Sequence, residues 1–314
     1  MRTTPAQDAE IAAAREARHE TRRPTAPALE EVLYQVLPVL DHGFVRVVDY
    51  MGDDAAIVQA ARVSYGRGTK RVNEDRGLIR YLMRHHHTTP FEMSELKLHC
   101  KLPIFVARQW IRHRTANVNE YSGRYSILDR EFYLPPADAL CVQSTGNRQG
   151  RGVSLDAERA AAVLQILKDD ATRCYDHYQE LLNEDEAGQT IRPGEPSLAR
   201  ELARINLTLG FYTQWYWKID LHNLLHFLLL RGDAHAQEEI RAYAQAISDV
   251  AQRWMPLAWE AFVDYRLEAM TLSRAEGEAV RAMLAGERPD LAALGLSKRE
   301  QNELRAKLGS HGAR

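Results

Sequence analysis

The 314-residue sequence contains only three cysteines, and they stand far apart, at Cys100, Cys141 and Cys174. No two of them have the spacing of a metal-binding pair or of a disulfide framework. We therefore expect reduced thiols that act as small buried apolar groups in a cytoplasmic protein. This pattern argues against a disulfide-rich secreted scaffold and against a zinc site built on cysteine.

Long apolar runs and an excess of one charge are missing as well. The most apolar stretch, LLHFLLL at 224–230, is too short to span a bilayer and is interrupted by a histidine. The N-terminus has no apolar signal-peptide core. The formal net charge is -2, whereas nucleic-acid-binding proteins are usually strongly basic. We expect neither a membrane nor a nucleic acid as partner.

The motifs of several common catalytic folds are also missing. The sequence contains no GxGxxG, GxSxG or HExxH pattern, and the Gly-rich basic stretch STGNRQGRGV at 144–153 lacks the residue order of a Walker A loop. We interpret that stretch as a surface loop. No cysteine lies near the arginine cluster described below, so chemistry there is expected to depend on a bound cofactor and not on a protein nucleophile.

The composition divides the chain into three parts. Residues 1–30 are rich in Ala, Pro and charged residues and poor in large apolar ones, which predicts a disordered tail. Residues 31–271 are expected to form a single α+β domain. Residues 272–314 contain two S-x-x-E capping boxes and are predicted to form a helical appendage.

Local patterns predict a mainly antiparallel sheet flanked by helices. In ELKLHCKL at 95–102, Leu and Cys alternate with Lys and His, which is typical of a half-buried strand, and GFVRVVDYM at 43–51 has the β-branched and aromatic composition of another. Because strands are few and helices many, we expect an α+β fold. Helices are predicted from about 55, from about 74, over 104–115, over 155–183 and up to Arg231.

Three helix boundaries concern residues that matter below. The helix over 104–115 is expected to lead directly into a loop. Ser197 can cap a helix that carries Arg200 and Arg204 on one face, and Asp233 can cap the helix that follows the one ending at Arg231.

The stretch RHRTANVNEYSGRYS at 112–126 is the most informative in the chain. Its positive groups are mainly arginine (Arg112, Arg114, Arg124), and only Glu120 lies within the stretch to pair with them. A guanidinium holds a phosphate or carboxylate with two parallel, charge-assisted hydrogen bonds. We therefore predict a site for a phosphorylated heterocycle, with surface ion pairs as the alternative.

The histidines allow several interpretations. His222 and His226 have the i,i+4 spacing of a zinc site, but no third ligand follows at a diagnostic spacing. We therefore predict no metal site. His235 and the run at 85–87 can be hydrogen-bonded structural residues or can contact a flat heterocyclic ligand. Arg231, which closes an apolar helix, can complement the helix dipole or bind a ligand.

The stretch at 112–126 resembles the signature of the flavin-dependent thymidylate synthases, RHRxxSxNExSxRY. Every fixed position agrees except one, because Asn117 stands where the family usually has Ser. The similarity covers roughly residues 43–270 and leaves both tails outside. It extends in the family's order to GDDAAIVQAARVSYG (52–66), HTTPFE (87–92), PIFVARQWIRHR (103–114) and LRGDAHAQEEI (230–240).

The resemblance implies a reaction and a fold. Residues 31–271 become a catalytic domain that methylates dUMP to dTMP, with 5,10-methylenetetrahydrofolate as carbon donor, FAD as redox carrier and NADPH as reductant. The implied fold is of the thymidylate synthase-complementing type, assembled as a homotetramer whose subunits share active sites. The absence of a nearby cysteine is consistent with this family, which does not attach the uracil to a cysteine.

The resemblance also implies which residues bind the ligands. The cofactors are expected to contact Ser64, His87, Thr89, Glu92, Arg112, His113, Arg114, Asn119, Glu120, Asp220, His222, His226 and His235. The substrate dUMP is expected to contact Gln109, Arg112, Glu120, Ser122, Gly123, Arg124, Arg204 and Arg231. Some residues belong to both sets because the flavin is expected to stack on the pyrimidine.

Two residues are candidates for catalysis. The guanidinium of Arg231 is expected to stabilise the negative charge that develops on the pyrimidine ring as its C5 becomes nucleophilic. Ser122 is expected to lie near the pyrimidine, with its hydroxyl as a positioning donor.

Some positions depart from the family, and two other functions stay open. Asp220, His222 and His226 lie where some relatives carry Asn, Arg and Asn, so this part of the FAD site is expected to differ here. A metal-dependent nucleotide phosphohydrolase would use the histidines together with Asp233. A non-catalytic module for nucleotides or RNA would use the arginine cluster alone, and its binding would weaken steeply with salt.

Overall fold

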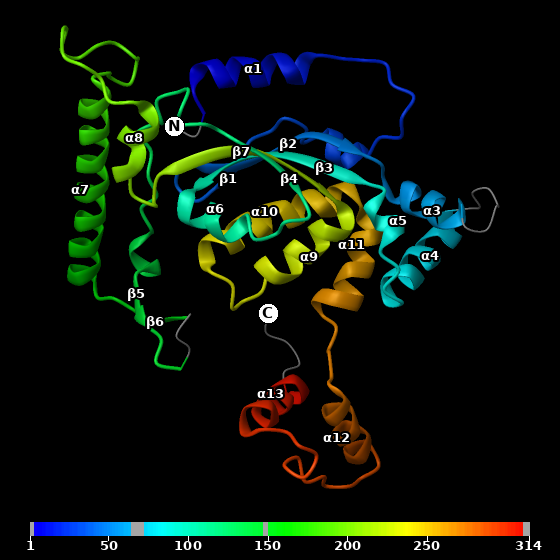
Figure 1. Cartoon of the computed structure of the whole chain (residues 1–314). Helices are drawn as coiled ribbons and strands as arrows, with labels where there is room; N and C mark the ends of the chain where they lie inside the picture. The colour runs from blue at the N-terminus through cyan, green and yellow to red at the C-terminus, as the bar shows by residue number, and fades with distance from the viewer. Residues whose placement is uncertain (1–2, 64–71, 147–149, 310–314) are drawn as a thin grey trace. The chain divides into compact units, whose positions relative to one another are not determined.

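The structure is a computed structural model that describes residues 3–63, 72–146 and 150–309. Contacts divide the chain into two compact units, Met1–Glu260 and Ala261–Arg314, and each is described separately. The strands and helices are drawn in Figure 1.

The first unit is built on a five-stranded antiparallel sheet with the strand order β1-β2-β3-β7-β4. The alternation predicted for the third strand is present up to Cys100, because Leu96, Leu98 and Cys100 are fully buried. It is wrong at Lys101, which is buried as well and pairs with Glu131. Leu98 is paired with Trp217, so both side chains enter the same core. The predicted strands and the α+β class are confirmed. The five strands are β1 (Leu37–Val39), β2 (Gly43–Met51), β3 (Glu95–Pro103), β4 (Asn117–Glu120) and β7 (Tyr212–Asp220).

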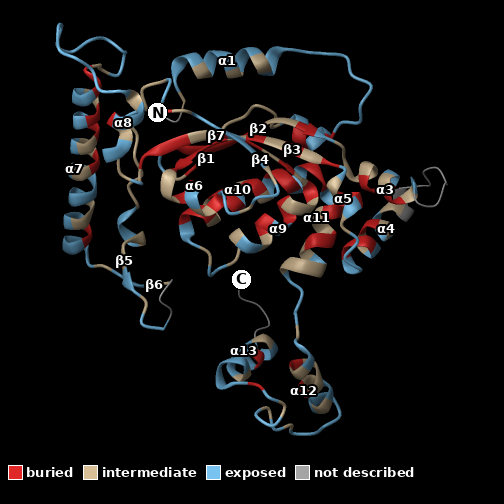
Figure 2. Cartoon of the chain, viewed as in Figure 1, coloured by how far each residue is buried: buried red, intermediate tan, exposed pale blue. Residues whose placement is uncertain are grey.

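Three helices cover one face of this sheet: α6 (Ile104–Trp110), α9 (Leu221–Arg231) and α10 (Glu238–Trp254) (Figure 1). The ring of Trp110 lies at the centre of this core, 5.0 Å from the ring of Trp217 and 4.8 Å from that of Phe227. In Figure 2 the buried residues concentrate in the sheet and in these helices. The core therefore fixes the helix ends that carry the candidate site.

Helix α6 ends at Trp110, five residues earlier than predicted. Residues 111–116 form a turn, and the following residues form β4, which pairs with β7, where a loop was expected. The edge of β7 accounts for this difference. The backbone N–H and C=O groups of 117–120 form hydrogen bonds with β7, whereas in a continued helix they would bond to each other.

Two predicted helix caps are wrong. Leu198 donates its N–H to the carbonyl of Leu181, and the short helix α8 spans only Arg200–Ala203, with Ala199 at the N-cap position and no side-chain cap. Arg204 lies in the following 3-10 turn, Arg204–Asn206. Asp233 accepts the N–H of His235 in a local turn, and Gln237 stands at the N-cap position of α10 without a side-chain cap.

The remaining helices of the first unit flank the sheet. The long helix α7 buries Tyr175 and Tyr178 against Phe211 in a second hydrophobic cluster. Asp54 joins α3 to α11, because its carboxylate accepts the N–H groups of Leu257 and Ala258. These elements are α3 (Asp54–Val63), α4 (Val72–Arg84), α5 (Thr89–Glu92), the 3-10 turn Ala137–Ala139, the hairpin strands β5 (Cys141–Gln143) and β6 (Arg151–Ser154), α7 (Ala157–Leu182) and α11 (Pro256–Phe262).

The N-terminal segment contains two short helices, α1 (Pro5–Glu16) and α2 (Pro27–Glu30). Helix α1 buries none of its residues, whereas Leu29 of α2 is fully buried. Arg15 donates a hydrogen bond to the carbonyl of Leu33. The boundary of the predicted tail at residue 30 stays a prediction, and a pair of truncations in the Discussion addresses it.

The second unit contains a short π-helix (Val263–Leu267), α12 (Arg274–Leu284) and α13 (Lys298–Gly309). Both capping boxes form, with Ser273 paired to Glu276 and Ser297 paired to Glu300. Its small core joins Ala279, Leu296 and Leu304. In neither unit do the described residues include a helix of the length and apolarity that a membrane span requires.

Candidate active site

The arginine-rich stretch occupies the corner where α6 ends and β4 begins. Arg112 lies in the turn after α6, and Asn119 and Glu120 lie on β4, opposite Tyr216 and Trp215 of β7. The last residue of α9, Arg231, reaches the same corner. Two stretches that are distant in the sequence, 112–120 and 215–231, therefore meet beside one sheet edge.

Arg231 and His113 are in direct contact. The Arg231 Nε–H donates to His113 Nε2 at 2.9 Å. The His113 ring lies edge-on to Phe227, with 4.9 Å between ring centroids, and 6.0 Å from the ring of His226. Burial, then the charge of Arg231 and then His226 lower the pKa of His113 to about 4. The imidazole is thus neutral at pH 7, and since Nε2 accepts, its proton resides on Nδ1.

The corner holds more positive charge than its own carboxylates balance. Burial and the nearby charge of Arg112 lower the pKa of Arg231. Among the residues that the structure describes, none forms an ion pair with Arg112, Arg114 or Arg231. Like charges held together without a counter-ion favour an anionic ligand. The electrostatics therefore fit the phosphate-bearing ligand predicted from the sequence.

Several residues near the corner have partners within the chain. The Glu120 carboxylate accepts the hydroxyl of Thr213 at 2.7 Å. Arg124 pairs with Glu201 at 3.2 Å, and both side chains are more than half exposed. An exposed pair of this kind contributes at most about 1 kcal/mol, so a phosphate can displace Glu201. Ser122 Oγ accepts the N–H of Arg124 at 3.3 Å.

Gly123 is packed tightly, and Gln109 has an unpaired acceptor. Gly123 is buried, and a Cβ there would lie 3.3 Å from the side chain of Leu128. The Oε1 atom of Gln109 on α6 is buried and has no hydrogen-bond partner among the described residues. An acceptor left unpaired in this way is satisfied when a ligand supplies a donor.

A polar chain that sequence reasoning missed joins the corner to the start of α9. The Thr115 hydroxyl donates to Asn223 Oδ1 at 2.8 Å, and Asn223 Nδ2 donates to Asp220 Oδ2 at 2.7 Å. Asp220 also caps α9 by accepting the N–H of Asn223. The sequence contains a local signal for the contact between Asp220 and Asn223, because Asn223 is the third residue of a helix capped by Asp220. Only the fold brings Thr115 to Asn223.

The other predicted residues lie on several elements. His222 is half-buried and His226 exposed, both on α9, and Arg204 is half-buried. Thr89 and Glu92 lie on α5, which packs against α9, and the ring of His87, just before α5, lies 5.8 Å from that of Tyr81. The exposed His235 pairs with Asp233. Ser64 lies outside the described residues.

No group of three or more His, Cys, Asp or Glu side chains in the described parts of the chain could hold a metal ion. His222 and His226 share a helix, but no carboxylate or thiol joins them there. The phosphohydrolase alternative therefore lacks a metal centre among these residues.

A family model supplies the deciding comparison. The model described as "Thymidylate synthase complementing protein" matches residues 46–257, about two thirds of the chain. The chain belongs to this family. The matched region contains the arginine-rich corner and Arg231, and the resemblance found in the sequence is confirmed.

Relatives and solved structures agree with the family. The chain is 60% identical to a flavin-dependent thymidylate synthase of Gluconobacter oxydans, over 98% of this chain and 99% of the relative. It is also 60% identical to a flavin-dependent thymidylate synthase of Ruegeria pomeroyi, over 96% and 97% of the two chains. The fold resembles the crystal structure of the UMP/dUMP methylase PolB from Streptomyces cacaoi bound with 5-Br UMP, with TM-score 0.62 and 32% identity over 72% of this chain and 95% of that one.

Proposed function

We propose that this chain is a flavin-dependent thymidylate synthase that methylates dUMP to dTMP with 5,10-methylenetetrahydrofolate, FAD and NADPH. The observation that carries the proposal is the corner of Arg112, Arg114 and Arg231, whose guanidinium groups pair with no carboxylate of the described chain. Membership of the family and 60% identity to two such synthases support the same reaction.

The residues present fit the cofactor and the substrate. Arg112 and Arg114 offer unpaired forks for the phosphates, and the buried Gln109 Oε1 lacks a donor that a pyrimidine N–H can supply. When bound, FAD supplies the redox chemistry by carrying reducing equivalents from NADPH to the transferred carbon. The chain's own residues bind the ligands, orient them and stabilise charge.

We assign the ligand contacts as follows. FAD and the folate are held by Ser64, His87, Thr89, Glu92, Arg112, His113, Arg114, Asn119, Glu120, Asp220, His222, His226 and His235. The substrate dUMP is held by Gln109, Arg112, Glu120, Ser122, Gly123, Arg124, Arg204 and Arg231.

Arg231 is assigned the main catalytic role. Its Nε–H is used by His113, which fixes the plane of the guanidinium, while its terminal N–H groups bond to none of the described residues. A neutral acceptor orients Arg231 without neutralising it, so its full charge is available to the ligand. Placed beside N3 and a ring carbonyl of the pyrimidine, this charge stabilises the anion that makes C5 nucleophilic.

Ser122 is assigned a positioning role. Its oxygen accepts the N–H of Arg124, which leaves the hydroxyl hydrogen free to donate to the pyrimidine. In this proposal Ser122 positions the uracil by a hydrogen bond and forms no covalent bond to it.

We further propose that a second copy of the chain covers the surface beside Arg204, in a homotetramer. Ile205 and Leu209 are 74% and 63% exposed there, and large apolar residues that are exposed together are typical of a surface that another chain covers. Light scattering on the Ile205→Glu variant is expected to show dissociation, whereas Leu284→Glu, at an equally exposed residue of the second unit, should leave the assembly intact. A monomeric wild type would refute the assembly. A cytoplasmic location stays a prediction.

The first experiment is an absorption spectrum of the purified protein after FAD is added and the excess removed. NADPH is then added without oxygen, followed by dUMP and methylenetetrahydrofolate. A retained flavin band that bleaches with NADPH, and dTMP in the final mixture, are the expected results. A protein that retains no FAD and makes no dTMP would refute the proposed function.

A further inference from the structure

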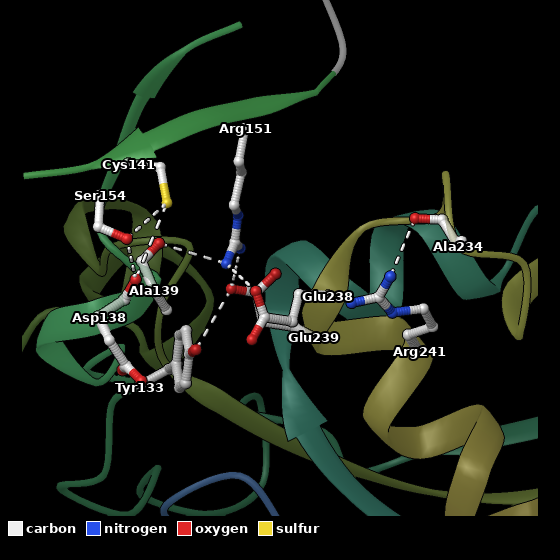
Figure 3. A network of polar contacts seen from close by, with 10 residues as sticks. All are labelled: Tyr133, Asp138, Ala139, Cys141, Arg151, Ser154, Ala234, Glu238, Glu239 and Arg241. Atoms are coloured by element: carbon white, nitrogen blue, oxygen red, sulfur yellow. Dashed lines mark hydrogen bonds and ion pairs between the residues drawn. The ribbon is translucent and has the colours of Figure 1, made fainter. Parts of the chain in front are cut away.

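Arg151 of the β5–β6 hairpin pairs with two carboxylates at the start of α10 (Figure 3). From β6, Arg151 donates to Glu238 Oε2 at 2.6 Å and to Glu239 Oε1 at 2.5 Å. A third, longer hydrogen bond reaches the carbonyl of Ala139 at 3.4 Å. One planar guanidinium thus joins the hairpin to the first turn of α10.

The two carboxylates differ in what they contribute. The Glu238 side chain is 50% exposed, so its pairing with Arg151 is weak, whereas the Glu239 side chain is only 4% exposed. Glu239 also accepts the hydroxyl of Tyr133 at 3.2 Å, and burial together with Glu239 raises the pKa of Tyr133. Within the described part of the chain, Arg151 is the only cation paired with Glu239. The buried carboxylate therefore depends on the hairpin for its counter-charge.

This anchored helix start lies close in sequence to the catalytic corner. Arg231 ends α9, residues 232–237 form the turn, and Glu238 begins α10. Arg241 braces the turn from the α10 side by donating to the carbonyl of Ala234 at 2.9 Å (Figure 3). Because the turn is short, a displacement of the first turn of α10 is transmitted to the end of α9.

We propose that Arg151 is a positioning residue that holds the α9–α10 turn, through Glu239, in the place where Arg231 meets His113 and the pyrimidine. Arg151 thus serves the reaction through Glu239 and the turn. The role of Arg231 toward dUMP rests on the proposed function, but the contact between Arg231 and His113 does not.

The test separates positioning from stability. Arg151→Ala alone leaves a buried carboxylate without a counter-charge and can unfold the protein, so the informative variant is the double variant Arg151→Ala/Glu239→Gln. The glutamine keeps a partner for Tyr133 and removes the buried charge, and the melting temperature should return toward that of the wild type. Arg151→Lys keeps a positive charge but loses the two-pronged contact. Glu238→Gln, at the exposed partner, is the matched control.

Two readouts follow Arg231 directly. The first is the NMR titration of ¹³C-labelled histidine, in which the pKa of His113 should rise from about 4 toward its ordinary value in the double variant, and we expect the same direction in the Arg231→Ala reference. The second is the KM for dUMP, which we expect to rise about tenfold, since small misplacements of a binding group can cost far more than that. Arg151→Lys should show smaller changes of both kinds, and Glu238→Gln should match the wild type.

The outcomes separate the positioning role of Arg151 from the proposed function. An unchanged His113 titration in a well-folded double variant, or in Arg151→Lys if the double variant fails to fold, would overturn the positioning role. A wild type that makes no dTMP would instead refute the proposed function, and the His113 titration would still decide the role of Arg151.

Discussion

Replacing Arg231 by alanine tests the proposed chemistry most directly. The substitution removes the hydrogen bond to His113 and the charge assigned to the pyrimidine, while Arg112 and Arg114 remain. Loss of one donor that stabilises a developing anion costs about 10²–10³ in rate, or roughly 2.7–4 kcal/mol. The structural cost is small by comparison, because Arg231 is half-exposed and its contribution at a helix C-terminus is about 0.3–1 kcal/mol.

The assay measures dTMP formation in a single turnover together with the flavin absorbance of the same sample. We expect Arg231→Ala to retain FAD and to form dTMP at least a hundredfold more slowly. Arg231→Lys should form dTMP more slowly than the wild type, because an ammonium lacks the planar fork with which a guanidinium can bond His113 and hold the pyrimidine at once. Arg192→Ala, at an exposed arginine paired with Glu180 and Glu195, is the matched control and should behave as the wild type.

Turnover by Arg231→Ala within a few-fold of the wild type, with FAD bound, would refute the role given to this residue. Loss of FAD together with turnover would show instead that Arg231 holds the cofactor. The His113 titration adds an internal check, since its pKa should rise once the neighbouring positive charge is removed.

Three further predictions concern Ser122, His113 and the N-terminus. Ser122→Ala should keep measurable dTMP formation, with a KM for dUMP raised several-fold; complete loss of activity with intact dUMP binding would contradict a positioning role. His113 has a lowered pKa, so the unfolded chain binds more protons between pH 4 and 6.5, and the stability gained from neutral His113 is complete above about pH 6.5 and is lost as the pH falls toward 4. Urea titrations should therefore show that the free energy of unfolding falls less between pH 7 and pH 5 for His113→Gln than for the wild type. Equal decreases in the two proteins would refute this account. Removal of residues 1–20 should leave activity and melting temperature unchanged, because α1 buries nothing, whereas removal of 1–30 also deletes the buried Leu29 and should cost about 2–5 kcal/mol, measured by thermal unfolding. Equal stability of the two truncations would show that Leu29 contributes no packing energy.

Prediction from sequence worked best where a periodicity or a motif is complete within one segment. The alternation in 95–102 has a period of two, and only a strand with one buried face satisfies it, as β3 does up to Cys100. Both capping boxes of the second unit formed because their donors and acceptors lie three residues apart. These interactions are local, so the sequence around them contains all the information needed.

Prediction failed where a distant segment competes for the backbone. The helix expected to reach Thr115 stops at Trp110, because β7 offers a sheet edge to the residues that follow. Asp233 was assigned to a helix cap, yet its carboxylate serves the turn that precedes α10. In both places the local pattern permits two structures, and tertiary contacts select between them.

The sequence by itself determined the chemistry of this protein: a stretch rich in arginine with few acids, a family signature with one departure at Asn117, and no nearby cysteine. Only the tertiary structure decided which of these groups act together. It placed Arg231 against His113 across 118 positions of chain, and it tied Arg151 to Glu239 across 88. The physical reason is that charge and hydrogen-bonding capacity belong to single residues, whereas lowered pKa values, unpaired guanidinium groups and buried counter-charges arise from what packing brings within a few ångströms.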